Sequence, residues 1–455
     1  MNFLVGQSLI KQKKFGKALN IFLDLLKNKH KDKRVYFCLG LIYFELNNFE
    51  KSVFYYNEYL KINPKSINTI LNLAIVQQSS GNLDLAKKNY LKVIDLDNSK
   101  IRPYYGLSML DINFLTQEHY EQINQILNIN NTNNYEKGLA NFILSKKEKK
   151  NKNYKKEINY LKKFHLYNFN SNYTYNLSSE FYYKKIINKH YDKIKFSNKE
   201  KNLQIIENKK PIFIIGLPRS GSTLIESILT SSEEGIKSCA ESHVINMSIL
   251  EQIGPKIYTN NFNPKKFIFE INQIEIKKSI LKNYNKFDIS NENIKPTFID
   301  KSLENFLNIE IILQVFPNAK FLHTFRNPID SVMSIYQSML SELSWAHKIK
   351  DILEYINNYQ IIINHFKVKY PSKIMDINLE HFTSNSEAVA ERIYKFCDLQ
   401  WNKKYLEFYK RNNLFSKTMS FNQIRKKISK YDRAKYKPYI SLLEGEEQLY
   451  KWIKI

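Results

Sequence analysis

The chain has 455 residues, several times what one small core needs, so we expect two or three domains. Hydrophobic residues at 43% and aromatic residues at 14% exclude a globally disordered chain. The formal net charge of +26 makes a polyanion, a nucleotide or an acidic acceptor a reasonable partner. Lysine is abundant along the whole chain, so we favour a general compositional bias over a basic surface built for nucleic acid, and we expect no nucleic-acid partner.

The cysteines give no sign of a disulfide framework or a zinc site. Cys38, Cys239 and Cys397 are scattered, with neither paired nor metal-type spacing, and they suit a reducing cytoplasm. The first residues lack the charged leader and cleavage site of a signal peptide, and no later run is long enough to span a bilayer. We therefore expect a soluble, cytoplasmic protein without a membrane span.

The N-terminal part repeats itself with a period of 34 residues. Small residues recur at one position of the repeat and large apolar residues at another, as in Gly6, Gly40, Ala74 and Ser108 and in Phe22, Tyr56 and Tyr90. Small residues let two helices approach closely, and large residues fill the space between helical pairs. The pattern resembles the tetratricopeptide repeat and predicts a helical repeat array over residues 1–168.

The register of the repeat slips after about residue 110, although residues 120–127 still read as a helix. A further helical pair is predicted around residues 139–145 and 154–164. The lysine-rich run between them indicates a solvated turn and helix face rather than a binding element. Residues 169–209 lack clean periodicity, and we interpret them as a helical linker to a second domain over residues 210–455.

The second domain opens with a strand, a tight loop and a helix, in the segments PIFII, GLPRSGS and TLIESIL. The chain has only 11 glycines, yet Gly216 and Gly221 lie five positions apart here. Backbone amides at such positions can surround an anion without interference from a Cβ atom. Ser222 and Thr223 fall at the helix N-terminus, where free N–H groups favour phosphate or sulfate.

The spacing GxxxxG followed by Ser-Thr is that of a P-loop, except that Ser222 stands where a nucleoside triphosphatase has its lysine. Without that lysine, and with no obvious acidic strand end for magnesium, hydrolysis of a triphosphate loses its main electrostatic parts. Arg219 supplies a bidentate positive group instead. A P-loop kinase is therefore a disfavoured alternative.

A second anion site is predicted about a hundred residues later, in NAKFLHTFRNPIDSVMS. Residues 320–325 read as a strand, Arg326 and Asn327 as its exit, and Pro328 as the first residue of a helix. Ser334 lies eight positions after Arg326, about two turns into that helix. Both loops leave strands at their C-terminal ends, where open parallel sheets bind nucleotides.

These motifs carry a family resemblance. PIFIIGLPRSGSTL resembles the 5'-phosphosulfate loop, and FRNPIDSVMS the 3'-phosphate motif, of sulfotransferases that use 3'-phosphoadenosine 5'-phosphosulfate (PAPS). The chain is most similar to the bacterial group in which tetratricopeptide repeats precede a domain similar to protein-tyrosine sulfotransferases. FIDKSLENFL, INLEHF, FCDLQW and TMSFNQIR also follow in the expected order. The resemblance implies an α + α/β fold, with a helical repeat array before a P-loop-like parallel-sheet sulfotransferase domain.

The resemblance also implies roles for single residues. The 5'-phosphosulfate would be bound by Arg219, Ser220, Gly221, Ser222 and Thr223, and the 3'-phosphate by Arg326 and Ser334. Lys301 would stabilise charge on the bridging oxygen as the sulfuryl group leaves. Ser420 would contact the donor, and Gln423 and Arg425 belong to the same closing segment. Arg219, Lys301 and Ser420 would therefore act in catalysis.

Glu241 matches the acidic residue that acts as general base in the related enzymes, and the acceptor hydroxyl must lose its proton as sulfur is attacked. His243 is the alternative, because histidine is the usual base in small-molecule sulfotransferases. On a helix, positions two apart do not share a face, so the two residues are not expected to act together. We expect Glu241 to be the base.

The physical case for the donor is independent of the family. A donor with about four negative charges needs several cations around it, and Arg219, Lys301 and Arg326 meet that demand without a metal. Lys427 and Tyr436 stand where proline and tryptophan are usual in the family, which leaves the adenine contacts open. The acceptor would be a hydroxyl or an amine, on a polypeptide recruited by the repeats in one interpretation. A catalytically inactive repeat scaffold with a relic nucleotide-binding domain is the remaining alternative.

Overall fold

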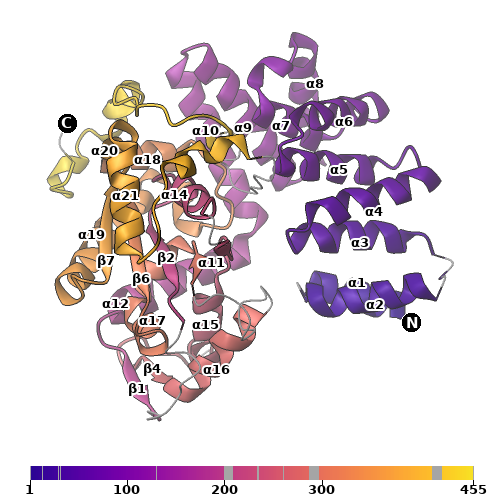
Figure 1. Ribbon diagram of the computed structural model, residues 1–455. Helices are drawn as coiled ribbons and strands as arrows, with labels where there is room; N and C mark the ends of the chain where they lie inside the picture. Colours follow the sequence, from indigo (N-terminus) through magenta and orange to yellow (C-terminus); the bar gives the residue numbers. More distant parts are fainter. Residues whose placement is uncertain are drawn as a thin grey trace. The chain divides into compact units, whose positions relative to one another are not determined.

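The computed structural model describes residues 2–453 except 13, 29, 31, 130, 199–208, 233–234, 260, 286–296 and 412–422. The described part of the chain divides into two compact units, with the boundary between Ser171 and Asn172 (Figure 1). No described helix combines the length and the hydropathy that crossing a membrane requires.

The described residues of the first unit are helical, and most helices pack on the next one along the chain. The helices are α1 (Asn2–Lys11), α2 (Phe15–Lys27), α3 (Arg34–Glu45), α4 (Phe49–Ile62), α5 (Ile67–Ser80), α6 (Leu83–Leu96), α7 (Ile101–Leu110), η1 (Ile112–Phe114), α8 (Gln117–Asn128), α9 (Asn134–Lys150) and α10 (Tyr154–Ser171). The predicted helical repeat array is therefore confirmed.

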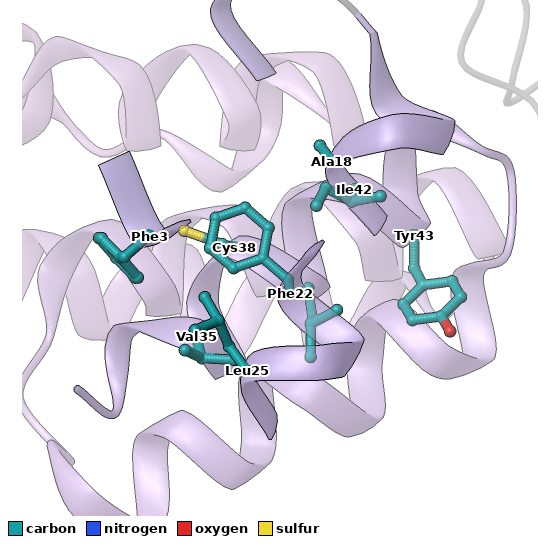
Figure 2. Packing of buried hydrophobic residues seen from close by; sticks show 9 residues of the cluster. Phe3, Ala18, Phe22, Leu25, Val35, Cys38, Ile42 and Tyr43 are labelled. Atoms are coloured by element: carbon teal, nitrogen blue, oxygen red, sulfur yellow. The ribbon is translucent and has the colours of Figure 1, made fainter. Parts of the chain in front are cut away.

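The small residues of the repeat lie under the rings of the large ones. A Cβ atom on Gly6 would come within 2.7 Å of the Phe22 ring, and one on Gly40 within 2.6 Å of the Tyr56 ring. Helices α3 and α4 are also joined by the Ser52 hydroxyl, which donates to the Gly40 carbonyl at 2.7 Å. Figure 2 shows the buried cluster around Phe22 that α1, α2 and α3 share. In these two units the 34-residue period thus reflects packing, because a large ring occupies the space left by a glycine.

The second unit contains a parallel sheet, a smaller two-stranded sheet and many helices (Figure 1). Its strands are β1 (Lys195–Ser197), β2 (Ile212–Gly216), β3 (Lys237–Ser238), β4 (Glu270–Asn272), β5 (Phe298–Asp300), β6 (Lys320–Phe325) and β7 (Ile374–Asn378). Its α-helices are α11 (Tyr173–Phe181), α12 (Asn188–His190), α14 (Ser222–Leu229), α15 (Val244–Ile257), α16 (Gln273–Tyr284), α17 (Ile309–Val315), α18 (Pro328–Tyr336), α19 (Ile349–Lys369), α20 (Leu379–Ser384) and α21 (Ser386–Phe396). The described residues of this unit also form a π-helix, η2 (Tyr182–Ile187), and short 3-10 helices, namely η4 (Leu303–Leu307), η5 (Ser344–His347), η6 (Lys403–Lys410), η7 (Gln423–Arg425), η8 (Lys437–Leu443) and η9 (Glu446–Gln448).

Residues 172–198 are part of the second unit in the structure. Helix α11 packs on η5, and β1 pairs with β4 in the small parallel sheet.

The main sheet has the order β3-β5-β2-β6-β7, and its strands are parallel. Strand β2 lies in the middle and is buried throughout, which explains why its sequence is a continuous apolar run rather than an alternating one. Because the strands are parallel, the segments that follow them all emerge at one edge of the sheet. The predicted strand at 320–325 and the predicted helix start at Pro328 are both confirmed.

Candidate active site

The loop after β2 needs glycine at two positions. Gly216 has a φ of 139°, and a Cβ atom there would come within 2.2 Å of the Thr324 carbonyl oxygen on β6. Gly221 has a φ of 92° and caps α14, and its Cβ atom would meet Leu379 at 2.7 Å. Both constraints turn the chain tightly, so the loop leads directly from the strand into the helix N-terminus, as predicted.

The loops after β2 and β6 lie side by side, because the two strands are hydrogen-bonded neighbours. The hydroxyls of Ser220 and Thr324 are 2.8 Å apart, and Ser220 also donates to the Leu217 carbonyl at 2.6 Å. Ser220, Ser222 and Thr223 are all buried. The two predicted anion sites therefore occupy one edge of the sheet.

Arg326, at the end of β6, is buried with only part of its hydrogen-bonding capacity used. Its guanidinium donates to the Asp330 carbonyl at 2.9 Å and to the Tyr431 hydroxyl at 3.3 Å, and it lies 5.8 and 5.5 Å from the ring centres of Tyr431 and Tyr436. Among the described residues, the buried Nε of Arg326 has no hydrogen-bond partner. A buried cationic donor without an acceptor is costly, which suits a site that takes an anion.

Arg219 in the first loop lies near Arg326 of the second. Burial and the neighbouring charge of Arg326 both lower the pKa of Arg219. Two positively charged guanidinium groups repel each other, and an anion between or beside them stabilises both. Ser334 is buried on α18, whose first turn supplies the Asp330 carbonyl to Arg326. The residues present thus fit an anionic nucleotide that contacts both the loop after β2 and the loop after β6.

Lys301 follows β5 and is fully buried. Its ammonium group lies 2.9 Å from a Glu226 oxygen, 3.4 Å from a Glu241 oxygen and 3.4 Å from the Thr223 hydroxyl. Burial alone would lower the pKa of Lys301, but the two carboxylates outweigh it and raise the pKa, so the group stays charged. The structure therefore brings a permanent cation to the start of α14.

Glu241 and His243 follow β3 in a loop, because α15 begins only at Val244 and His243 caps it with a φ of 52°. The expectation that this segment is helical is therefore wrong. The Glu241 side chain is 47% exposed and contacts Lys301. His243 hydrogen-bonds Glu304, and the charge of Glu304 raises the pKa of His243 to about 9. At neutral pH His243 is thus protonated, whereas a general base must be unprotonated.

The closing segment is only partly described, and Ser420 lies outside the described residues. Gln423 is exposed and Arg425 partly buried, both in η7, which lies against α14. Burial lowers the pKa of Arg425. The structure thus places Arg425 beside the helix that begins at the first anion loop.

Sequence reasoning missed two carboxylates of this site. Glu226 was overlooked, although it lies three positions after Thr223 on a predicted helix and so shares its face. Asp300, which ends β5 beside β2, was also overlooked as an acidic strand end.

Asp300 is buried, and burial raises its pKa. Both of its oxygens already accept hydrogen bonds, from Ser242, Tyr284, Asn305 and the backbone of Ser302. Asp300 therefore ties neighbouring segments together. No cluster of His, Cys, Asp and Glu side chains suited to a metal ion occurs in the described part of the chain.

Comparison with known sequences identifies both parts of the chain. Residues 211–403 match the model of the sulfotransferase family, and residues 34–66 and 67–100 match models of the tetratricopeptide repeat. An uncharacterized protein of Aquifex aeolicus (strain VF5) is 29% identical over 240 residues, covering 51% of this chain and 31% of that protein. Protein-tyrosine sulfotransferase A of Caenorhabditis elegans is 22% identical over 227 residues, covering 47% of this chain and 56% of that protein. The chain thus spans less than two thirds of either relative.

Among solved structures, the sulfotransferase domain of the Synechococcus PCC 7002 olefin synthase aligns with 52% of this chain and 90% of its own, at 19% identity and a TM-score of 0.35. The family assignment rests on the sequence matches, which cover the β2 loop, Lys301 and the β6 loop. The chain therefore joins tetratricopeptide repeats to a domain of the sulfotransferase family.

Proposed function

We propose that this chain transfers a sulfuryl group from PAPS to a hydroxyl or amine acceptor. The observation that carries the proposal is the convergence of Arg219 and Arg326 from the adjacent strands β2 and β6. A donor with phosphate at its 3' end and phosphosulfate at its 5' end needs two cationic sites on one side of the sheet. Such a ligand would give the Nε of Arg326 the acceptor that it lacks among the described residues, and it would offset the repulsion between the two positively charged arginines.

Each loop would bind one end of the donor. The 5'-phosphosulfate would lie on the loop of Arg219, Ser220 and Gly221 and at the N-terminus of α14, where Ser222 and Thr223 stand. The 3'-phosphate would lie at Arg326 and Ser334. Gln423 and Arg425, beside α14, would close the site together with Ser420.

Glu241 would accept the proton of the acceptor hydroxyl as the oxygen forms its bond to sulfur. The bond between sulfur and the bridging oxygen breaks, and 3'-phosphoadenosine 5'-phosphate (PAP) leaves with that electron pair. Lys301, buried and charged, would stabilise the negative charge that grows on the bridging oxygen, and Arg219 would assist it from the loop after β2. The protonated state of His243 at neutral pH favours Glu241 as the base. The residues so assigned need no metal, and we expect turnover to persist in EDTA.

The acceptor is a separate part of the proposal. The repeats would recruit a polypeptide, and similarity to a protein-tyrosine sulfotransferase makes a tyrosine hydroxyl the first acceptor to test. Incubation with labelled PAPS and a panel of tyrosine peptides, sugars and phenols, with and without residues 1–171, would show whether the repeats contribute.

Thermal shift with PAP and with ATP tests the donor directly. A ligand at 100 times its Kd stabilises the folded state by about 2.7 kcal/mol, so a micromolar ligand is easily detected. We expect PAP to raise the unfolding temperature more than ATP. A preference for ATP would favour a kinase, and no response to either would favour an inactive scaffold.

Glu241→Gln tests the base. The variant keeps the size of the side chain but cannot accept the proton, so we expect turnover to fall about a hundredfold or more while PAP still stabilises the protein. Normal turnover in this variant would reject Glu241 as the base.

A further inference from the structure

Glu226 of α14 makes a shorter contact with Lys301 than Glu241 does, yet none of the sequence motifs gives it a role. We infer that Glu226 is the fixed counter-ion of Lys301: it holds the ammonium group in place and so leaves the Glu241 carboxylate available as the base. Glu226 is on this account a positioning residue, because it acts through Lys301. The inference rests on the proposed function and adds to it the group that keeps two oppositely charged catalytic residues from neutralising each other.

Both oxygens of Glu226 are committed. One accepts from the Ser238 hydroxyl at 2.5 Å, and the other contacts the Lys301 ammonium at 2.9 Å. The Ser238 oxygen itself accepts from the backbone N–H of Ala240 at 2.9 Å, so its single hydrogen is free to point at Glu226. Since the Glu226 side chain is only 14% exposed, water competes little for these bonds. The orientation of the carboxylate is thus set by protein groups.

The segment from Ser238 to Ala240 also holds the backbone of Lys301. The N–H of Lys301 donates to the Ala240 carbonyl at 2.9 Å, and the N–H of Ala240 starts the chain of hydrogen bonds that reaches Glu226. Ala240 has a φ of 51°, a conformation that residues other than glycine rarely adopt. Lys301 is therefore anchored at its backbone and at its ammonium group by one connected network.

Glu241 is held differently. Its carboxylate lies 3.4 Å from Lys301 and its side chain is 47% exposed. Among the described residues, no other ion pair or hydrogen bond of this side chain occurs besides that with Lys301. Glu241 is thus the partner that can leave Lys301 and turn to an acceptor, while Glu226 remains.

The charges explain why both carboxylates are useful. Two carboxylates share one ammonium group, so the cluster of Glu226, Glu241 and Lys301 carries one net negative charge. Neither carboxylate has Lys301 as an exclusive partner. Without the charge of Glu226, Lys301 would pair with Glu241 alone, and that closed pair would hold the base in its ionised form and away from the acceptor. Removal of the Glu226 charge should therefore make Glu241 a weaker base without lowering the affinity for PAPS.

The test is Glu226→Gln, with transfer from labelled PAPS to 2-naphthol and to water measured between pH 5 and 9. We expect kcat to fall about 10- to 100-fold while the KM for PAPS does not rise, because the site loses a negative charge rather than a cation. We also expect the acidic limb of the pH–rate profile to move about one pH unit lower, since a lone Lys301–Glu241 pair resists protonation. A merely structural role would not shift that limb.

Two variants accompany it. Ser238→Ala removes one hydrogen bond of Glu226 and should give a smaller loss of kcat in the same direction, which keeps the test informative if Glu226→Gln does not fold. Glu275→Gln is the matched control, because this exposed carboxylate on α16 pairs only with Lys278 three positions away at 3.5 Å among the described residues. It should leave kcat and the profile unchanged.

Wild-type kcat in Glu226→Gln would overturn the inference, as would a loss of kcat with an unshifted profile. Loss of turnover in Glu226→Gln together with normal turnover in Glu241→Gln would also overturn it, and would make Glu226 the base. These failures differ from failure of the proposed function, in which the wild-type protein would show neither stabilisation by PAP nor transfer from PAPS. In that case both ideas would be rejected.

Discussion

Replacement of Gly216 by alanine should strongly destabilise the second unit. Its φ of 139° is rarely adopted by residues with a Cβ atom, and the new methyl group would lie 2.2 Å from the Thr324 carbonyl oxygen. We take about 1–2 kcal/mol for the conformation. Overpacking against backbone that cannot rotate away adds about 1–3 kcal/mol. The sum of about 2–5 kcal/mol corresponds to a fall in Tm on the order of 10 °C for a domain of this size.

The control is Gly445→Ala, at a position that also has a positive φ but lacks the clash. Gly445 has a φ of 89°, and among the described atoms nothing lies within 4 Å of its would-be Cβ atom. It should lose only about 1–2 kcal/mol. Scanning calorimetry, which can separate the transitions of two units, measures both variants. Equal losses of Tm in the two variants would refute the argument that the close approach of β2 to β6 dictates glycine at position 216.

Three further predictions follow from named contacts. Arg326→Ala should weaken PAP binding at least tenfold, measured by calorimetric titration, because it removes a buried charged donor; unchanged affinity would place the 3'-phosphate elsewhere. The raised pKa of His243 means that its pair with Glu304 stabilises the protein fully below about pH 6.5 and loses that effect as pH rises through about 9. With the imidazole half exposed, His243→Gln should cost about 1 kcal/mol in urea unfolding at pH 6 and nothing near pH 10; a loss independent of pH would contradict the pairing. Gly40→Ala should destabilise the repeats by about 1–3 kcal/mol through the Tyr56 ring and leave the PAP-induced thermal shift intact.

Local and periodic features were predictable from the sequence. The 34-residue period predicted the repeats because successive units pack by similar contacts, such as Gly6 against Phe22 and Gly40 against Tyr56. The β2 loop could be located because its glycines are five positions apart and its neighbours are a short apolar strand and a helix. The strand before Arg326 and the helix start at Pro328 were also predictable, since proline fits the first turn of a helix. In each case the determining residues are close together in the chain.

The electrostatic state of the site depended on the tertiary structure. Arg219 lies near Arg326, Lys301 is shared by Glu226 and Glu241, and the charge of Glu304 raises the pKa of His243. Each of these contacts joins residues that lie 60 or more positions apart in the chain. Asp300 was not recognised as a strand end because its strand is only three residues long. The order of the strands in the sheet decides which of these groups meet, and charge interactions depend on distance in space rather than along the chain. The sequence alone therefore determined which local elements form and which chemical groups they carry, and the packing of the sheet decided which of those groups act on one another.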